Sequence, residues 1–224
     1  MPGMRILGLE TATHRLSVAL WRDGEVVERS AFQPNSSSEW LLPAVRALLA
    51  EAECNLHEID GIAFGAGPGS FTGLRLAAGC AQGLAYGLGR PVLGICTLEA
   101  LAQASGEEKV FACLDARMNE VYTAVYAGGL EVQASEVLPP SEVRLPAGDG
   151  WVGCGDGFAR YRDSLPVFAC VREDVLPTAA AVVALAAPRF ARGEGVDAAQ
   201  ALPLYVRDKV ALTTAERLAR GGVR

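Results

Sequence analysis

The sequence contains few of the residues that build metal and redox sites. Its two histidines, His14 and His57, lie far apart, and its six cysteines form no Cys-x-x-Cys pair. This spacing excludes thioredoxin-type redox chemistry, a zinc ribbon and a two-histidine metal site on one helix. We expect the cysteines to be small buried residues and the histidines to lie at the surface.

Long apolar segments and a secretory signal are also missing. The longest apolar stretch without a charge, residues 76–89, is shorter than the roughly 20 residues that a membrane-spanning helix needs. No basic, apolar and small-residue signal opens the chain. We therefore expect a cytoplasmic protein without membrane contact. With 50% hydrophobic and 21% charged residues, the composition is typical of a globular chain and excludes general disorder.

The charge of the chain is acidic and unevenly distributed. A formal net charge of −6 argues against a broad nucleic-acid-binding surface. The segment from Arg207 onward nevertheless carries five basic residues and two acidic ones. This basic segment is either a solvated terminus or a contact for RNA or for an acidic partner.

The N-terminal part of the sequence predicts three antiparallel strands followed by a helix. Apolar runs over residues 4–10, 16–21 and 26–32 predict the strands, with a tight turn between the last two. Ser36 and Glu39 then form a capping box before apolar residues at helical spacing. Because Pro43 lacks a backbone N–H, either the N-cap is Ser38 or the helix kinks at the proline.

A strand, a helix and a second strand follow, which predicts a β-α-β crossover. We expect the strands over residues 61–65 and 91–96 and the helix over 71–88. A further helix over 98–104 ends in a polar segment, which is the best place for a lobe boundary. We therefore predict an N-terminal lobe of residues 1–105 and a C-terminal lobe of residues 106–224, whose last residues can pack back on the first lobe.

The second half repeats this pattern less regularly. The expected elements are strands over residues 110–115, 121–126, 132–138, 152–154 and 167–171 and a helix over 178–191. Two ribonuclease-H-like halves, the second degraded, describe an α/β fold with the two-lobed architecture of the actin, hexokinase and acetate-kinase group. This analogy concerns the fold and assigns no function.

A glycine-rich segment, Gly65–Arg75, lies between a predicted strand and a predicted helix. Glycines allow close backbone approaches, and a helix N-terminus can hold an anion. The Rossmann and Walker patterns are both incomplete here, and no nucleophile elbow surrounds Ser70. The competing interpretation, which we favour, is a structural elbow in which Ser70 or Thr72 caps the helix.

Two carboxylates end matching strands of the two halves. Glu10 and Asp115 could face a common cleft and hold a magnesium–nucleotide complex, with Thr11 and Thr13 beside them. We favour a structural role, because no complete adenosine pocket can be identified nearby; residues 153–157 form only a glycine-rich turn.

The predicted helix over residues 71–88 carries a stripe of small residues. Arg75, Gly79, Gly83 and Gly87 recur every four residues, and each interior glycine costs about 1 kcal/mol relative to alanine. Such a stripe allows another helix to approach closely. Either it packs within the chain or it forms an interface between chains. The residues predicted to bind a partner on the first two helices are Trp40, Ala44, Ala47, Arg75, Gly79, Gly83, Tyr86 and Gly87.

Several ordered motifs together resemble the bacterial TsaB (YeaZ-type) family of tRNA threonylcarbamoyladenosine biosynthesis proteins. The most specific is Gly67–Arg75 (GPGSFTGLR). The others are Ile6–Thr13 (ILGLETAT), Ser38–Pro43 (SEWLLP), Leu98–Ala102 (LEALA), Asp115–Arg117 with Glu120–Tyr122, and Pro203–Arg207 (PLYVR). The chain departs from the family at Glu10, where aspartate is usual, and at Ser37, where a histidine is common.

The resemblance implies a non-catalytic subunit with an actin-like fold. Family members support the paralogous transferase TsaD, together with the ATPase TsaE, in modifying the adenosine 3′ of the anticodon in tRNAs that read codons beginning with adenine. They bind TsaD, or a second copy of themselves, through the first two helices. ATP and Mg²⁺ are used by the complex, and no cofactor is assigned to this chain alone. Direct contact with tRNA and the oligomeric state of the free chain stay open.

Two enzyme classes compete with this interpretation. One is a nucleotide-dependent kinase or transferase that uses Glu10 and Asp115 with Mg²⁺ in the interlobe cleft. The other is a protease or chaperone-like hydrolase, against which the lack of a serine, cysteine or metal constellation argues.

Overall fold

The computed structural model describes residues 3–32 and 36–206, which build two five-stranded sheets. The first sheet has the order β3-β2-β1-β4-β5. Its strands are β1 (Arg5–Glu10), β2 (Arg15–Arg22), β3 (Glu25–Phe32), β4 (Gly61–Gly67) and β5 (Val92–Cys96). β1 pairs antiparallel with β2, and β2 with β3, whereas β1 pairs parallel with β4, and β4 with β5. The predicted opening strands and the β-α-β crossover are thereby confirmed.

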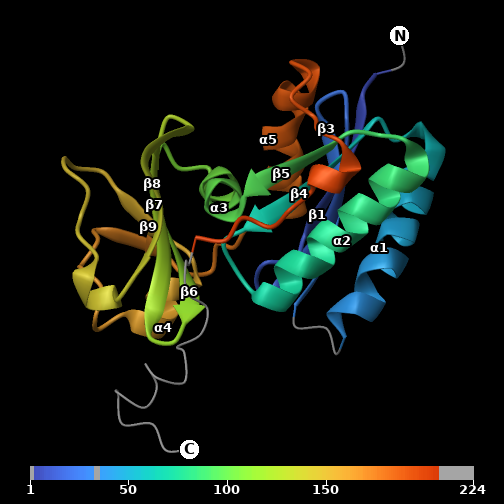
Figure 1. The fold of residues 1–224 in the computed structure, drawn as a ribbon. Coiled ribbons are helices and arrows are strands. Elements are labelled where there is room, and N and C mark those ends of the chain that lie inside the picture. The colour runs from blue at the N-terminus through green and yellow to red at the C-terminus, as the bar shows by residue number, and fades with distance from the viewer. Residues whose placement is uncertain (1–2, 33–35, 207–224) are drawn as a thin grey trace, which may run out of the picture.

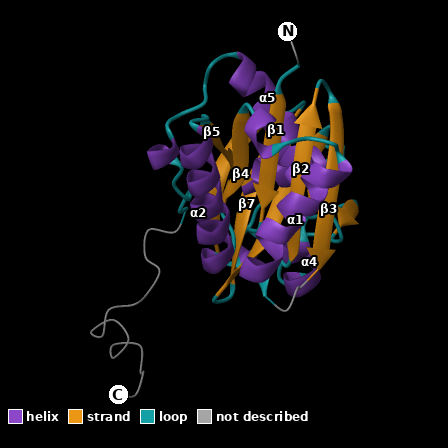
Figure 2. Ribbon diagram, turned by 90° about the vertical axis from the view of Figure 1, so that its right-hand side faces the viewer, coloured by secondary structure: helices purple, strands orange, loops and turns teal. Residues whose placement is uncertain are grey.

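Helices cover both faces of the first sheet (Figures 1 and 2). α1 (Ser37–Glu51) and α2 (Phe71–Leu88) lie side by side on one face and share a core with Leu7, Leu9 and Phe64. α5 (Ala179–Ala191) packs on the opposite face, against Ile6 and Ala63 among others. Because successive side chains of β1 point to opposite faces of the sheet, they pack against the helices on both faces.

The N-terminus of α1 resolves the alternative that the sequence leaves open. Ser36 is the N-cap, and its side chain accepts a hydrogen bond from the Glu39 N–H at 3.4 Å. Ser38 is therefore not the N-cap. Pro43 lies inside the helix on its exposed side, where water can reach the carbonyl that the missing N–H leaves unpaired.

The second sheet repeats the strand order of the first, as β8-β7-β6-β9-β10. Its strands are β6 (Lys109–Arg117), β7 (Glu120–Ala127), β8 (Leu130–Leu138), β9 (Val152–Cys154) and β10 (Cys170–Arg172). The repeat confirms the two-lobed α/β fold. Where α1 stands in the first half, the second has only a short 3-10 turn, η2 (Pro140–Glu142), and its crossover helix α4 (Asp156–Tyr161) has six residues.

One strand of the second half lies later than predicted. The expected strand over residues 167–171 is wrong at its start, because β10 begins at Cys170 and Val167 is 91% exposed. Phe168 is buried, but it packs in an aromatic cluster with Phe111 and Phe158 outside any strand. The apolar run over residues 167–171 therefore indicates the burial of Phe168 and does not mark the start of the strand.

The two halves meet at α3 (Thr97–Ser105). Ala100 of this helix packs in the core of the first sheet, whereas Leu98 and Leu101 pack in the core of the second. The predicted division after residue 105 falls between α3 and β6. The chain later returns to the first half through α5, through a bridge between Val196 and Val92 after it, and through η3 (Ala198–Gln200), which packs beside α2.

The described cysteines and helices answer two further expectations. All six cysteines are free thiols; Cys54, Cys113 and Cys154 are buried as expected, but Cys170 is exposed. Among the described residues, no helix has the length and apolarity needed to cross a bilayer. Two short 3-10 turns, η1 (Leu56–Glu58) and η2, connect elements at the surface.

Candidate functional site

The glycine-rich turn between β4 and α2 is packed tightly against the chain itself. Gly67 has φ +122°, and a Cβ there would lie 2.6 Å from the Leu204 carbonyl oxygen. The Ser70 N–H donates to the Ala12 carbonyl oxygen at 2.8 Å, and the Ser70 hydroxyl accepts from the Gly73 N–H at 3.4 Å. Ser70 is therefore the N-cap of α2, and the turn is the structural elbow that we favoured from its sequence.

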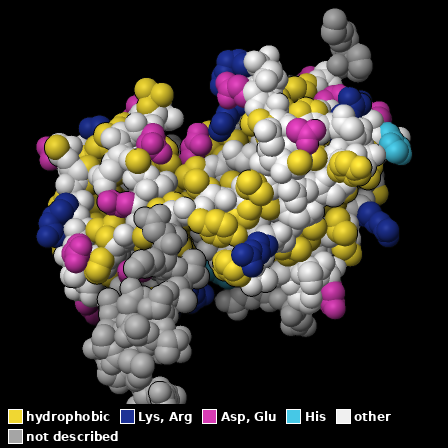
Figure 3. All heavy atoms as spheres, viewed as in Figure 1, with side chains coloured by type: hydrophobic (Ala, Val, Ile, Leu, Met, Phe, Trp, Pro, Cys, Tyr) yellow, Lys and Arg dark blue, Asp and Glu magenta, His cyan; other side chains and the backbone are white. Residues whose placement is uncertain are grey.

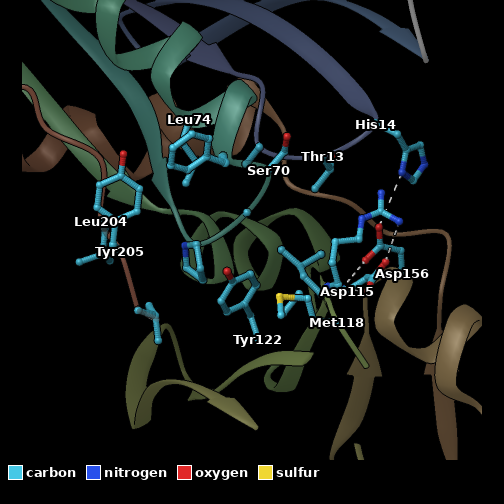
Figure 4. Close-up of a pocket in the computed structure, with 18 residues that line it drawn as sticks. Thr13, His14, Ser70, Leu74, Asp115, Met118, Tyr122, Asp156, Leu204 and Tyr205 are labelled. Atoms are coloured by element: carbon cyan, nitrogen blue, oxygen red, sulfur yellow. Dashed lines mark hydrogen bonds and ion pairs between the residues drawn. The ribbon is translucent and has the colours of Figure 1, made fainter. Parts of the chain in front are cut away.

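A pocket of about 430 Å³ opens between the two halves beside this elbow (Figure 4). Segments from both halves line it, since the β1–β2 turn and the elbow form one side and the ends of β6 and α4 the other. The lining residues are Ala12–His14, Pro68–Phe71, Leu74, Leu114–Met118, Tyr122, Asp156 and Leu204–Val206. The sequence predicted Thr13 and Asp115 at such a cleft, and both line it.

The acidic side chains at one end of this pocket lie beside basic residues (Figure 4). Asp115 forms ion pairs with Arg117 at 3.1 Å and Arg160 at 3.3 Å. Asp156 lies 3.6 Å from His14 Nδ1 and accepts a hydrogen bond from the Asp115 N–H. Burial raises the pKa of Asp156, an effect that the backbone hydrogen bond and His14 oppose. His14 could not be placed beside Asp156 from the sequence, because the pair joins different halves.

Glu10 does not reach the pocket. Its side chain is fully buried, and Oε1 accepts a hydrogen bond from the Ala12 N–H at 2.6 Å, while Oε2 has no hydrogen-bond partner among the described atoms. Desolvation raises the pKa of Glu10 to about 7. Thr11 is also buried, and its hydroxyl donates to the Gly73 carbonyl oxygen at 2.7 Å.

The four residues predicted to bind a nucleotide therefore do not all line the pocket. Thr13 and Asp115 line the pocket, whereas Glu10 and Thr11 hold the β1–β2 turn beneath it. Within the described ranges, no three histidine, cysteine, aspartate or glutamate side chains are grouped so as to hold a metal ion. Of the two carboxylates predicted to share a magnesium ion, only Asp115 lines the pocket.

The glycine stripe of α2 faces outward. Gly79, Gly83 and Gly87 are exposed, and a Cβ added to any of them would meet no described atom within 4 Å beyond the backbone of its own helix turn. Tyr86, on the same helix, is 86% exposed. In the space-filling view, apolar side chains and uncoloured backbone make up most of the surface over α2 (Figure 3). No other described part of the chain covers these glycines.

The three residues of α1 that were predicted to bind a partner differ in their burial. Ala44 is buried in the core shared with α2, so it is not available on the surface of the single chain. Trp40 and Ala47 are half-buried. Leu42, which the sequence analysis did not single out, is 47% exposed on the same helix.

A cluster of exposed rings around Arg75 was also missed. The Arg75 guanidinium carbon lies 3.6 Å from the centre of the Phe71 ring, and Arg75 Nε donates to the Tyr205 hydroxyl at 3.2 Å. Phe71 and Tyr205 are each 47% exposed. The neighbouring Leu204 N–H donates to the Ala66 carbonyl oxygen at 2.7 Å, which fixes this segment against the elbow.

Comparison with known proteins gives consistent similarities. The family model of the tRNA N6-adenosine threonylcarbamoyltransferase TsaD matches residues 33–139. The tRNA threonylcarbamoyladenosine biosynthesis protein TsaB of Escherichia coli K12 is 39% identical over 93% of this chain and 96% of its own length. The TsaB protein of Haemophilus influenzae is 33% identical over 94% of this chain and 96% of its own length.

A solved structure shows the same similarity in three dimensions. YeaZ from Pseudomonas aeruginosa superimposes with a TM-score of 0.85 at 42% sequence identity, covering 90% of this chain and 99% of the YeaZ chain.

Proposed function

The chain belongs to the TsaB family of tRNA threonylcarbamoyladenosine biosynthesis proteins, and on this basis we propose that it is a non-catalytic subunit of the modifying assembly. In this proposal it binds and supports a TsaD-type transferase, together with a TsaE-type ATPase, in the cytoplasm. The modified base is the adenosine 3′ of the anticodon in tRNAs that read codons beginning with adenine. The assembly uses ATP and Mg²⁺.

The observation that carries the proposal is the uncovered glycine stripe of α2. Interior glycines weaken a helix by about 1 kcal/mol each relative to alanine, so an exposed series of them needs a reason outside the isolated chain. Close approach of a partner helix provides one, since small residues allow backbones to pack at short distance. We propose that Trp40 and Ala47 of α1 and Tyr86 of α2 contribute to the same interface, and that this face also forms a homodimer when the transferase is absent.

The competing enzyme interpretations have weaker support. The kinase or transferase interpretation needs Glu10 and Asp115 together in the interlobe pocket; Asp115 lines the pocket, but Glu10 is buried away from it. A serine hydrolase would need Ser70 as nucleophile, but the Ser70 hydroxyl accepts the capping hydrogen bond of α2.

Replacing Gly83 with tryptophan tests the proposal directly. The new side chain would project from the stripe into the space of the partner, so we expect binding of the TsaD-type transferase to weaken by about 100-fold or more. Size-exclusion chromatography of the mixed proteins measures complex formation, and thermal unfolding of the variant alone verifies its fold.

Ala191→Trp provides the matched control, because Ala191 is exposed at the end of α5 on the opposite face of the sheet. We expect this control to bind as the wild type does. Unchanged complex formation by a folded Gly83→Trp variant would refute the proposed interface.

A further inference from the structure

Arg75 is the only charged residue of α2, and its side chain is held in place by two contacts. The guanidinium carbon stacks 3.6 Å from the centre of the Phe71 ring, and Nε donates to the Tyr205 hydroxyl at 3.2 Å. These contacts occupy one face and one edge of the guanidinium group. Neither uses the outer edge formed by Nη1 and Nη2, which is one of the edges that bind a carboxylate with two parallel hydrogen bonds.

Burial of the glycine stripe would also bury Arg75, which lies one helical turn before Gly79. A guanidinium group that loses water without gaining an anionic partner is strongly destabilising. Among the described residues, none of the ion pairs includes Arg75, and α2 itself contains no acidic residue. Since the described part of the chain supplies no carboxylate to Arg75, we expect the protein that covers this face to supply it.

We propose that Arg75 is a specificity-determining residue that receives an aspartate or glutamate carboxylate of the TsaD-type partner on Nη1 and Nη2. Phe71 and Tyr205 are positioning residues, because they fix the guanidinium plane before the partner arrives. This inference rests on the proposed function and adds the chemistry that the partner must present. It also extends the interface from the two helices to the segment around Tyr205.

Two other possible partners for the Arg75 guanidinium group fit the observations less well. A second copy of this chain offers only Glu39 and Glu51 on its α1 and α2, and Glu51 is already paired with Arg29 at 2.8 Å. A nucleic-acid phosphate could also bind a guanidinium edge, but the formal net charge of −6 opposes approach of a polyanion.

The test compares Arg75→Lys, Arg75→Met and Arg75→Glu in the full chain, titrated into the purified TsaD-type transferase of the same organism at low and high salt. We expect Arg75→Glu to weaken binding by about 100-fold or more, because it places two carboxylates together. Arg75→Lys should weaken it by about tenfold, because lysine lacks the planar fork. Arg75→Met should also lose most of the salt dependence that the wild type shows.

The positioning role has its own readout. Tyr205→Phe keeps the ring and removes only the hydroxyl, so we expect affinity to fall by about three- to tenfold, with the salt dependence retained. Arg192→Glu, at the far end of α5, controls for charge reversal as such. Thermal unfolding of each variant checks the fold.

Each result separates this inference from the proposed function. If the wild type does not bind the transferase, the proposed function fails. If the wild type binds and Gly83→Trp does not, while Arg75→Glu binds as the wild type does, only the role of Arg75 is overturned. It is likewise overturned if Arg75→Met weakens binding of tRNA but not of the transferase, or weakens only self-association.

Discussion

The two halves of this molecule share one strand order but differ in what covers their sheets. In the first half, α1 and α2 form a helical layer whose outer side carries the uncovered Gly79, Gly83 and Gly87. In the second half, the corresponding place has a 3-10 turn and the six-residue α4. The same backbone topology therefore supports a wide helical surface in one copy and a shorter cover in the other.

In the second half, a cluster of aromatic side chains from the same half packs against the sheet. The rings of Phe111 and Phe158 both pack against Phe168, with centroids 5.1 and 5.2 Å from it. Gly153 lies beneath this cluster, where a Cβ would meet the Phe158 ring at 2.5 Å. Gly153 thus makes room for an aromatic ring of the same chain, whereas the space beside the α2 glycines is filled by no described atom of the chain. This difference directs the search for a partner to the first half.

The largest effect expected from this comparison is on the stability of the second half. Phe158→Ala removes a ring that is 4% exposed, and loss of such a side chain typically costs about 3–5 kcal/mol. Urea unfolding measures the loss. The variant should bind the transferase normally wherever it is folded, because the cluster lies away from α2. A stability loss below about 1 kcal/mol would show that the second sheet is not held by these rings.

The ends of the matching strands β1 and β6 provide the next test. Asp115 is paired with Arg117 and Arg160, whereas Glu10 is fully buried with no cationic partner among the described residues, and desolvation raises its pKa from 4.5 to about 7. The folded state therefore binds the Glu10 proton more tightly than the unfolded state does. Stability contributed by the protonated form is present below pH about 4.5 and is lost as the pH rises through about 7.

We expect the free energy of unfolding to fall by up to about 3 kcal/mol across this interval. Glu10→Gln, which cannot ionise, should remove most of the slope. Urea unfolding at several pH values between 4.5 and 8 measures it in both proteins. The raised pKa of Asp156 contributes a slope of the same sign and stays in the variant. An unchanged slope in Glu10→Gln would contradict the assignment to Glu10.

Local chemistry made much of the first half predictable from sequence. The bounds of α2 were predicted correctly because Ser70 caps its start and Gly89, at φ +63°, ends it in the left-handed conformation. The strand after Phe158 was misplaced because burial of Phe168 depends on rings that are distant in the sequence. An apolar pattern in the sequence indicates that a residue is buried, but it does not identify the residues that pack against it.

In the candidate site, too, features that are local in the sequence could be predicted, whereas contacts between distant segments could not. The glycine stripe could be found from its four-residue period, which is a local property of the helix. Tyr205 could not be placed beside Arg75, because that contact joins residues 130 positions apart. Ala44 illustrates the opposite error, since a small apolar residue at helical spacing fits a partner face and a core equally well, and the structure places it in the core.

The smallest expected effect tests the comparison most closely, because it should have opposite signs in the two halves. Gly79→Ala adds a methyl group that meets no described atom within 4 Å beyond its own helix turn, so it should stabilise the isolated chain by about 0.5–1 kcal/mol through helix propensity. The same methyl group should weaken transferase binding, because it occupies the space of the approaching backbone. Gly153→Ala should instead destabilise the chain, because its Cβ would overlap the Phe158 ring. Thermal unfolding and calorimetric titration measure both properties. If Gly79→Ala stabilises the chain and binds the transferase as tightly as the wild type, the glycine at this position serves no partner.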